Sequence, residues 1–365
     1  MIKELFKSLL PIFFTAFAAA FALTPVARKL AEKVGAIDMP KARGVHTKPM
    51  PRFGGFAIYL GGLIAMAAFL PLFGERTVLG EAVEPSNQLF GLLGGSFVVF
   101  LIGVVDDIKG LSPKVKFLGQ LVAALIVCFA GIRIDFIGFP SAPEGYLYFP
   151  WYLSYPITVL WIVGITNTIN LMDGLDGLAA GLSLISSACI AYIAYIHGWY
   201  AMCLVLLAVA GSAAGFLPWN FHPAKIFMGD SGSLTLGFLL ATASLLSPAK
   251  VPTIFAVLTP VLVLALPIFD TFFAIVRRAV NRKPITVADK GHLHHRIMAV
   301  GMGQRRTVLT LYSICGTMGV AGIVISRGLK YEAILLMIFA FILVYVFIDD
   351  TKPTENGTVQ KEDEE

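Results

Sequence analysis

Residues 167–181 read NTINLMDGLDGLAAG, and this polar stretch separates two apolar runs of membrane-spanning character. It contains Asn167, Asn170, Asp173 and Asp176, which would be costly to leave without partners in hydrocarbon. Its glycines favour a turn. The stretch therefore marks the end of one membrane span and the start of the next, and its polar side chains need water, protein or a ligand to face.

The composition predicts a polytopic helical membrane protein. The chain has 365 residues, of which 57% are hydrophobic and 14% are charged, whereas a soluble chain carries about 25% charged residues. No long polar linker interrupts the apolar runs, so residues 1–348 are expected to form one integral-membrane domain. The polar tail, residues 349–365, is expected to be disordered in the cytoplasm. Eleven spans are predicted, with bounds good to a few residues: 9–27, 54–73, 89–105, 117–132, 153–167, 178–196, 200–217, 232–247, 252–275, 307–325 and 331–348.

The distribution of basic residues orients these spans. With the N-terminus outside, the inner loops and the tail hold 21 of the 28 lysines and arginines, which is the bias of cytoplasmic segments. The first run resembles a cleaved signal peptide only weakly, because it continues to about Ala27 and a basic loop follows it. We therefore expect an all-α bundle of about eleven transmembrane helices, with the N-terminus outside and the C-terminus in the cytoplasm.

Cysteines and basic residues exclude some classes of function. The four cysteines all lie in apolar runs without the spacing of metal ligands, so they are expected to be small core residues. The basic residues lie in loops between spans, which gives no support to a nucleic-acid partner.

The predicted orientation places every loop of unusual polar composition on the cytoplasmic face. Loops that converge on one face of a helical scaffold are typical of an active site. The loops are residues 28–53, 106–116, 168–177, 218–231 and 276–306.

Two adjacent carboxylates, Asp106 and Asp107, end the third predicted span. Neighbours on a helix point about 100° apart, so one can face a metal ion and the other a substrate. Mutual repulsion also favours a bound cation or a general-base role. The alternative is a solvated helix end, which the helix dipole would disfavour.

A third carboxylate, Asp230, stands between glycines in FMGDSGS and precedes the eighth predicted span. Glycine lets a backbone approach a phosphate closely, and a helix N-terminus attracts anions. The alternative is that Asp230 only caps the next helix. Phe227 comes three residues earlier and offers a ring on which a planar base can stack.

The last loop contains three histidines in four residues, His292, His294 and His295, followed by Arg296. The preference for positive charge inside explains the arginines and lysines of this loop but not the histidines. A zinc site is an alternative, although no cysteine accompanies them. Donation to a diphosphate suits these side chains better.

Basic residues in two further loops are candidates for substrate binding. Lys48 and Arg52 precede Gly54, and surface charge near anionic lipid is the alternative interpretation. Lys116 follows the aspartate pair and would neutralise a phosphate. Asp270 falls inside the ninth predicted span, where an ionisable residue indicates a functional group or a buried pair.

The carboxylates together predict a magnesium site. Asp106, Asp107 and Asp230, with Asn170, offer oxygen ligands that suit Mg²⁺ rather than zinc, with Mn²⁺ as an alternative. A divalent cation surrounded by cationic side chains at a membrane face indicates phosphoryl-type transfer between a soluble nucleotide and a lipid.

The motifs GVVDDIKGL, NTINLMDGLDGLA, FMGDSGS and HLHH, in this order, resemble the polyprenyl-phosphate N-acetylhexosamine-1-phosphate transferases. That family includes the translocase that forms lipid I of peptidoglycan. The resemblance covers roughly residues 10–325 and is closest to the bacterial branch that starts wall teichoic acid, O-antigen or similar glycopolymers. The translocase branch has three consecutive histidines, whereas Leu293 here precedes only His294 and His295. This departure argues against a muramyl-pentapeptide donor.

The resemblance implies transfer of GlcNAc-1-phosphate from UDP-GlcNAc to undecaprenyl phosphate, with Mg²⁺ and release of UMP. It implies that Asp230 is the principal metal ligand, with Asn170 beside it and Asp107 as a helper. Asp106 would lie near the lipid phosphate as a base or electrostatic guide. A homodimer would be unsurprising for the family.

The resemblance also implies roles in substrate binding. Asp176 resembles the position that reads the uracil edge, and Phe227 resembles the ring that stacks on it. Asp173 would support the turn or the nucleotide. Diphosphate contacts would come from Lys116, His294, His295 and Arg296, with His292 as a weaker candidate.

Two other classes of function fit less well. An intramembrane aromatic prenyltransferase would need a third aspartate that DDIKG lacks. An ion-coupled transporter would need polar groups at the bilayer midplane, where this sequence is apolar, and often shows an internal repeat.

Overall fold

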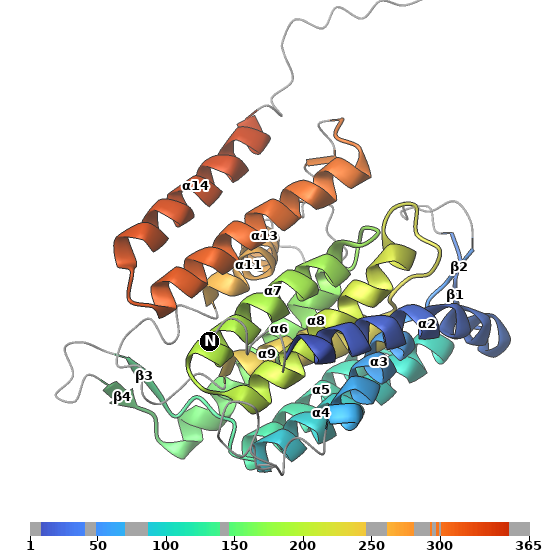
Figure 1. The fold of residues 1–365 in the computed structure, drawn as a ribbon, viewed down its shortest axis with the longest axis horizontal. Coiled ribbons are helices and arrows are strands. Elements are labelled where there is room, and N and C mark those ends of the chain that lie inside the picture. The colour runs from blue at the N-terminus through green and yellow to red at the C-terminus, as the bar shows by residue number, and fades with distance from the viewer. Residues whose placement is uncertain are drawn as a thin grey trace, which may run out of the picture.

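The computed structural model describes residues 9–40, 49–69, 87–138, 146–245, 261–280, 293, 297–298 and 301–349. Helices make up most of this part of the chain (Figure 1). They are α2 (Leu10–Val34), α3 (Gly54–Phe69), α4 (Asn87–Lys109), α5 (Pro113–Phe129), α6 (Trp151–Met172), α7 (Leu178–Ile196), α8 (Tyr200–Asn220), α9 (Asp230–Leu245), α11 (Ala265–Val280), α13 (Gln304–Ser326) and α14 (Lys330–Asp349).

Each of these helices coincides with one of the predicted spans, and the architecture is that of a helical integral membrane protein. Among the described residues, six helices are long and apolar enough to cross a membrane: α2, α4, α6, α7, α8 and α13. The shorter α3 is also apolar. The crossing of the membrane by all eleven helices, and the direction of the chain ends, stay predictions.

Several helices run past their predicted ends into polar sequence, because backbone hydrogen bonds continue where hydrocarbon stops. Helix α4 continues to Lys109 and helix α6 continues to Met172. The predicted loop bounds 106–116 and 168–177 were therefore wrong at their starts. Asp106, Asp107 and Asn170 lie on the last turns of helices, which hold their side chains more firmly than a loop would.

Helix α9 forms the centre of the bundle. Every residue from Ser231 to Ser244 is buried, and the helix packs against α4 and α6 and also against α3 and α7. Its residues are apolar or small on all sides, which is typical of a fully buried helix. Helix α13 packs against α7, and α14 packs against α13 on the outside of the bundle (Figure 1).

Two small antiparallel sheets lie at opposite ends of the bundle (Figure 1). Strand β1 (Ile37–Asp38) pairs with β2 (Met50–Pro51), and strand β3 (Phe136–Gly138) pairs with β4 (Tyr146–Tyr148). All four cysteines are free, as the sequence predicts.

Candidate active site

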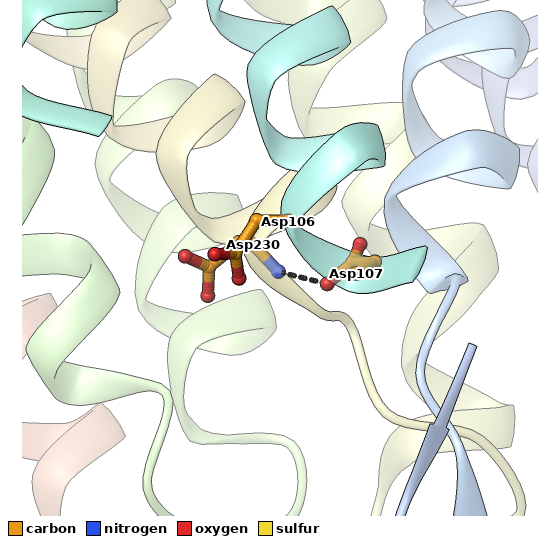
Figure 2. A group of neighbouring side chains, drawn as sticks. All are labelled: Asp106, Asp107 and Asp230. Carbon is orange, nitrogen blue, oxygen red and sulfur yellow. Dashed lines mark hydrogen bonds between the residues drawn. The ribbon is translucent and has the colours of Figure 1, made fainter. Parts of the chain in front are cut away.

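Three carboxylates meet where the C-terminal end of α4 approaches the N-terminal end of α9 (Figure 2). Asp106, Asp107 and Asp230 offer ligand oxygens that all lie within 4.8 Å of one another. The two α4 residues are buried, with 5% and 1% of their surfaces exposed. The structure thus brings together aspartates that are more than 120 positions apart in sequence.

Asp107 binds the start of α9 with both carboxylate oxygens. The backbone N–H of Asp230 donates to Oδ1 at 2.8 Å, and the N–H of Ser231 donates to Oδ2 at 3.1 Å (Figure 2). These N–H groups belong to the first turn of α9, which has no intrahelical partners for them. Helix α9 is therefore capped by a carboxylate of α4, which contradicts the alternative that Asp230 only caps its own helix. The side chain of Asp230 does not cap the helix and is available to bind other groups.

Glycines allow this close approach of helices. A Cβ on Gly103 of α4 would lie 2.4 Å from the Cα of Ser231, and a Cβ on Gly55 of α3 would lie 2.0 Å from the backbone nitrogen of Gly232. Real side chains do not tolerate such distances to backbone. Gly55, in the glycine pair that begins α3, therefore serves tight packing against α9.

Lys116 on the first turn of α5 connects two of the carboxylates. Its Nζ lies 2.8 Å from Oδ2 of Asp230 and 3.4 Å from Oδ1 of Asp106. The N–H of Leu111 also donates to Oδ1 of Asp106 at 2.8 Å. One ammonium group thus serves two carboxylates and is partly exposed, which leaves it accessible to a phosphate.

Asn170 approaches Asp230 from the last turn of α6. Its Nδ2 lies 3.2 Å from Oδ1 of Asp230 and 2.8 Å from the hydroxyl of Ser233. The amide carbonyl oxygen remains as the ligand atom that the predicted metal role needs. Asn167, one turn earlier, donates to Oε1 of Gln120 on α5 at 2.6 Å, so its role is structural.

The segments PMPRFGG and IFMGD run beside each other. The N–H of Phe227 donates to the carbonyl of Pro51, and the N–H of Gly54 donates to the carbonyl of Phe227 at 3.0 Å. Arg52 pairs with Phe227 in a parallel bridge, and its Nη2 reaches the Asp106 carbonyl at 3.3 Å. The structure therefore places Arg52 and Phe227 beside the carboxylates.

Asp173 and Asp176 lie in the short loop between α6 and α7. Burial, together with the negative charges of Asp230 and Asp107, raises the pKa of Asp173 to about 7. Asp176 accepts hydrogen bonds from the ring Nδ1 of His222 and from the backbone of the α8–α9 loop. No pattern in the sequence singled out His222, because its partner is 46 positions away.

The last predicted loop reaches the site only in part. Nε of Arg305, at the start of α13, donates to the carbonyl of His222 at 2.8 Å. Asp270 on α11 is buried and accepts the backbone N–H of Leu293 at 2.7 Å, so it anchors a residue of the HLHH motif. The predicted site residues that lie outside the described residues, and whose roles stay predictions, are Lys48, His292, His294, His295 and Arg296.

The arrangement supplies oxygen ligands, cationic groups and an aromatic ring at one end of the bundle. Among the described residues, the three carboxylates have one ion-pair partner, Lys116, which contacts two of them, so the cluster favours a divalent cation. Lys116 and Arg52 provide charge for phosphate groups. The site is chemically equipped to bind a nucleoside diphosphate with a metal ion.

Known proteins are similar in sequence to this chain. A model of the family described as Glycosyl transferase family 4 matches residues 89–248. A protein of Bacillus subtilis, named probable undecaprenyl-phosphate N-acetylglucosaminyl 1-phosphate transferase, is 41% identical over 348 residues, which are 95% of this chain and 92% of that protein.

More distant relatives are also named as transferases. Decaprenyl-phosphate N-acetylglucosaminephosphotransferase of Mycobacterium tuberculosis is 36% identical over 80% of this chain and 76% of its own length. Phospho-N-acetylmuramoyl-pentapeptide-transferase of Staphylococcus saprophyticus is 33% identical over 66% of this chain and 77% of its own length. The resemblance that the motifs predict is confirmed, and this chain belongs to the glycosyl transferase family 4, among the polyprenyl-phosphate N-acetylhexosamine-1-phosphate transferases.

Proposed function

We propose that this chain transfers GlcNAc-1-phosphate from UDP-GlcNAc to undecaprenyl phosphate and releases UMP, as the first membrane step of a cell-envelope glycopolymer. Membership of the family supports the reaction class, and the relative of 41% identity is named for this reaction. The observation that carries the proposal is the contact of Lys116 with both Asp106 and Asp230. Asp230 is the candidate metal ligand, Lys116 the candidate contact for the diphosphate, and Asp106 the candidate guide for the lipid phosphate.

The donor atoms fit Mg²⁺. Asp230 and Asn170 would hold the ion through oxygens, which are the ligands that Mg²⁺ prefers. Asp107 would contribute chiefly by fixing Asp230, since each of its oxygens already accepts a backbone N–H. When bound, the cation would neutralise negative charge on the diphosphate.

The residues of this chain then orient two substrates. Phe227 stacks on the uracil ring, Asp176 meets the edge of that ring, and Lys116 binds the diphosphate. Asp106 guides the lipid phosphate and takes its proton if the phosphate arrives as the monoanion. An oxygen of the lipid phosphate attacks the β-phosphorus, the bond from that phosphorus to the bridging oxygen breaks, and UMP leaves with the electron pair.

A single displacement is the simpler mechanism, because a phosphate monoester is already a competent nucleophile. A double displacement would instead make an aspartate attack first. The two are separated by incubating purified protein with UDP-GlcNAc and no lipid. Stoichiometric release of UMP that disappears in Asp106→Asn would overturn the single displacement.

The donor sugar is tested by measuring UMP release with undecaprenyl phosphate and a panel of UDP-sugars, with Mg²⁺ or with EDTA. We expect UDP-GlcNAc to be the best donor and EDTA to abolish turnover. Preference for UDP-MurNAc-pentapeptide would instead assign the chain to the activity named for its staphylococcal relative. Activity in EDTA would remove the metal from the proposal.

We also infer that all eleven helices cross the membrane, with the N-terminus outside and the aspartate cluster on the cytoplasmic face. The basic loops and the site of a soluble nucleotide sugar support this orientation. Cysteines introduced one at a time at exposed Lys225 and at exposed Tyr148 test it. We expect an impermeant reagent to label only Tyr148→Cys on intact cells. The homodimer stays a prediction, and light scattering of the purified protein would test it by giving the mass of the particle.

A further inference from the structure

A second polar network lies beside the aspartate cluster and fixes the carboxylate of Asp176. Nδ1 of His222 lies 2.8 Å from Oδ2 of Asp176, and the N–H of Ala224 donates to the same oxygen at 3.1 Å. Because a carboxylate only accepts, the proton of this bond lies on Nδ1. Within the described part of the chain, no donor reaches Oδ1. One oxygen of Asp176 is thus held by the α8–α9 loop, and the other is available to a ligand.

His222 is itself held in place from α13. Nε of Arg305 donates to the His222 carbonyl at 2.8 Å, and the hydroxyl of Tyr312 donates to the carbonyl of Gly177, next to Asp176. Both partners of the His222–Asp176 pair are therefore anchored to the same helix, which limits the directions in which the carboxylate can point.

The backbones of the two loops are joined by a route that does not use His222. The N–H of Gly177 donates to Oδ1 of Asn220 at 3.1 Å, and Nδ2 of Asn220 donates to the carbonyl of Ile226 at 3.0 Å. Asn220 is buried, with 2% of its surface exposed. Loss of the His222 side chain is therefore expected to leave the Asp176 carboxylate with the Ala224 N–H alone, free to rotate about that bond, while the loops stay together.

We propose that His222 is a positioning residue for nucleotide binding, which holds Asp176 so that its second oxygen faces the pyrimidine edge of the donor. This rests on the proposed function, because it takes Asp176 as the group that meets the base. The α8–α9 loop that carries His222 also carries Phe227, so one loop would set both the ring that stacks and the carboxylate that reads the edge. Uracil presents an N3–H donor to a carboxylate, whereas cytosine presents an acceptor there. A correctly oriented Asp176 therefore binds uracil and rejects cytosine.

Two substitutions of nearly equal size test this role. In His222→Asn the amide nitrogen can take the place of Nδ1 and donate to Asp176, whereas His222→Asp offers only acceptors and repels it. Binding of UMP and of CMP to the full-length protein is measured by calorimetry. We expect His222→Asn to keep UMP affinity within about threefold and His222→Asp to weaken it about tenfold or more. The ratio of UMP to CMP affinity should fall only in His222→Asp.

Kinetics and a remote histidine provide the controls. In His222→Asp the KM for UDP-GlcNAc should rise by about tenfold, while the KM for undecaprenyl phosphate stays unchanged. His197, at the opposite end of α7 from Gly177, is the matched control, and His197→Asn should leave both nucleotide affinities as they are. Equal behaviour of His222→Asn and His222→Asp would overturn the proposal.

Asp176→Asn separates failure of this inference from failure of the proposed function. If Asp176→Asn keeps the ratio of UMP to CMP affinity, Asp176 does not read the base. If it lowers the ratio while His222→Asp does not, Asp176 reads the base without help from His222. Melting temperatures identify any variant that loses its fold. Should His222→Asp unfold, His222→Ala removes the donor without adding charge, and the same ratio decides the outcome.

Discussion

Aspartates with basic partners lie at both ends of the helix bundle, but within the described residues only one of the two clusters has more carboxylates than ion-paired cations. At the β3–β4 end, Arg133 donates to Asp135 at 3.4 Å and to the hydroxyl of Tyr155 at 3.1 Å. The hydroxyl of Ser154 donates to the other oxygen of Asp135 at 2.7 Å. One arginine balances one aspartate there, and both oxygens of that aspartate are occupied.

At the β1–β2 end, Asp106, Asp107 and Asp230 lie together, and within the described residues the only cation at ion-pair distance is Lys116, which contacts Asp106 and Asp230 but not Asp107. The carboxylates are also less exposed than Asp135, whose side chain is 46% exposed. Exposed, balanced ion pairs contribute little to stability, whereas buried like charges persist only where function or a bound cation compensates for them. The difference between the two ends supports the proposal that one is structural and the other is the active site.

The largest expected effect compares one aspartate from each end. Asp230→Asn should lower kcat by about 10²–10³-fold, because it removes a charge that would hold the cation and contacts Lys116. Asp135→Asn should change kcat by less than about twofold, because its ion pair is exposed. UMP release by both purified variants checks this. Similar kcat values for the two variants would contradict the assignment of the active site to the Asp230 end.

Close packing at the site end gives the next effect. Gly103→Ala places a Cβ against the Ser231 backbone and should shift the start of α9, with a loss of activity of about 10–100-fold. The same overlap should cost about 1–3 kcal/mol of stability. Gly94→Ala is the matched control on the same helix, because its Cβ would meet only Ile126 at an ordinary 3.8 Å. We expect that variant to keep wild-type activity and melting temperature; an equal loss would contradict the packing argument.

Binding of magnesium at the aspartate cluster should raise the melting temperature of the protein, whereas the Asp135 end should contribute nothing to this rise. A ligand at about 100 times its Kd stabilises the folded state by about 2.7 kcal/mol, which is a rise of several degrees in the melting temperature. We expect Mg²⁺ to produce this rise in the wild type and in Asp135→Asn. Asp230→Asn should show little of it. A rise of the same size in Asp230→Asn would mean that the ion binds elsewhere.

The smallest effect concerns the dependence of stability on pH at Asp173. Its pKa is about 7 in the folded protein and about 4 in an unfolded chain, so the folded state binds the extra proton between these values. Stability therefore falls as pH rises from about 4 to about 7 and gains nothing back above that. Because the side chain in Asp173→Asn cannot ionise, the stability of this variant should not fall with pH in this way.

The measurement is the melting temperature of the wild type and of Asp173→Asn in EDTA, since a cation at the neighbouring carboxylates would change the charge balance. The advantage of Asp173→Asn should grow by a few degrees between about pH 5 and pH 8. An advantage that is the same at both pH values would show that Asp173 does not titrate in this range.

Local sequence patterns were enough to predict the helices and the chemical type of the site. Apolar runs predict most of the described helices within a few residues, because burial in hydrocarbon requires continuous apolar sequence. The exceptions are α2, which ends at Val34 rather than at 27, and α11, which begins at Ala265 rather than at 252. Asp106, Asp230 and Lys116, to which we assign the chemistry of the proposed site, each stand in a polar motif next to such a run. Their meeting is confirmed by the structure.

Features that depend on contacts between distant segments could not be predicted in the same way. The sequence suggested that Asp230 caps its own helix, but a carboxylate from α4 reaches there first because Gly103 lets the helices touch. The same holds for His222, which looks like an ordinary loop residue until the fold places it against Asp176.

The sequence by itself therefore determined a helical membrane protein with oxygen ligands and cationic groups for a nucleotide and a lipid phosphate, because composition and motif chemistry are local properties. Only the tertiary structure decided which oxygens are occupied and which are available. Asp107 is used by the α9 backbone, Asp230 is left facing Lys116 and Asn170, and Asp176 is held through one oxygen. Hydrogen-bond directions depend on how helices approach one another, and that approach is set by small residues far apart in the chain.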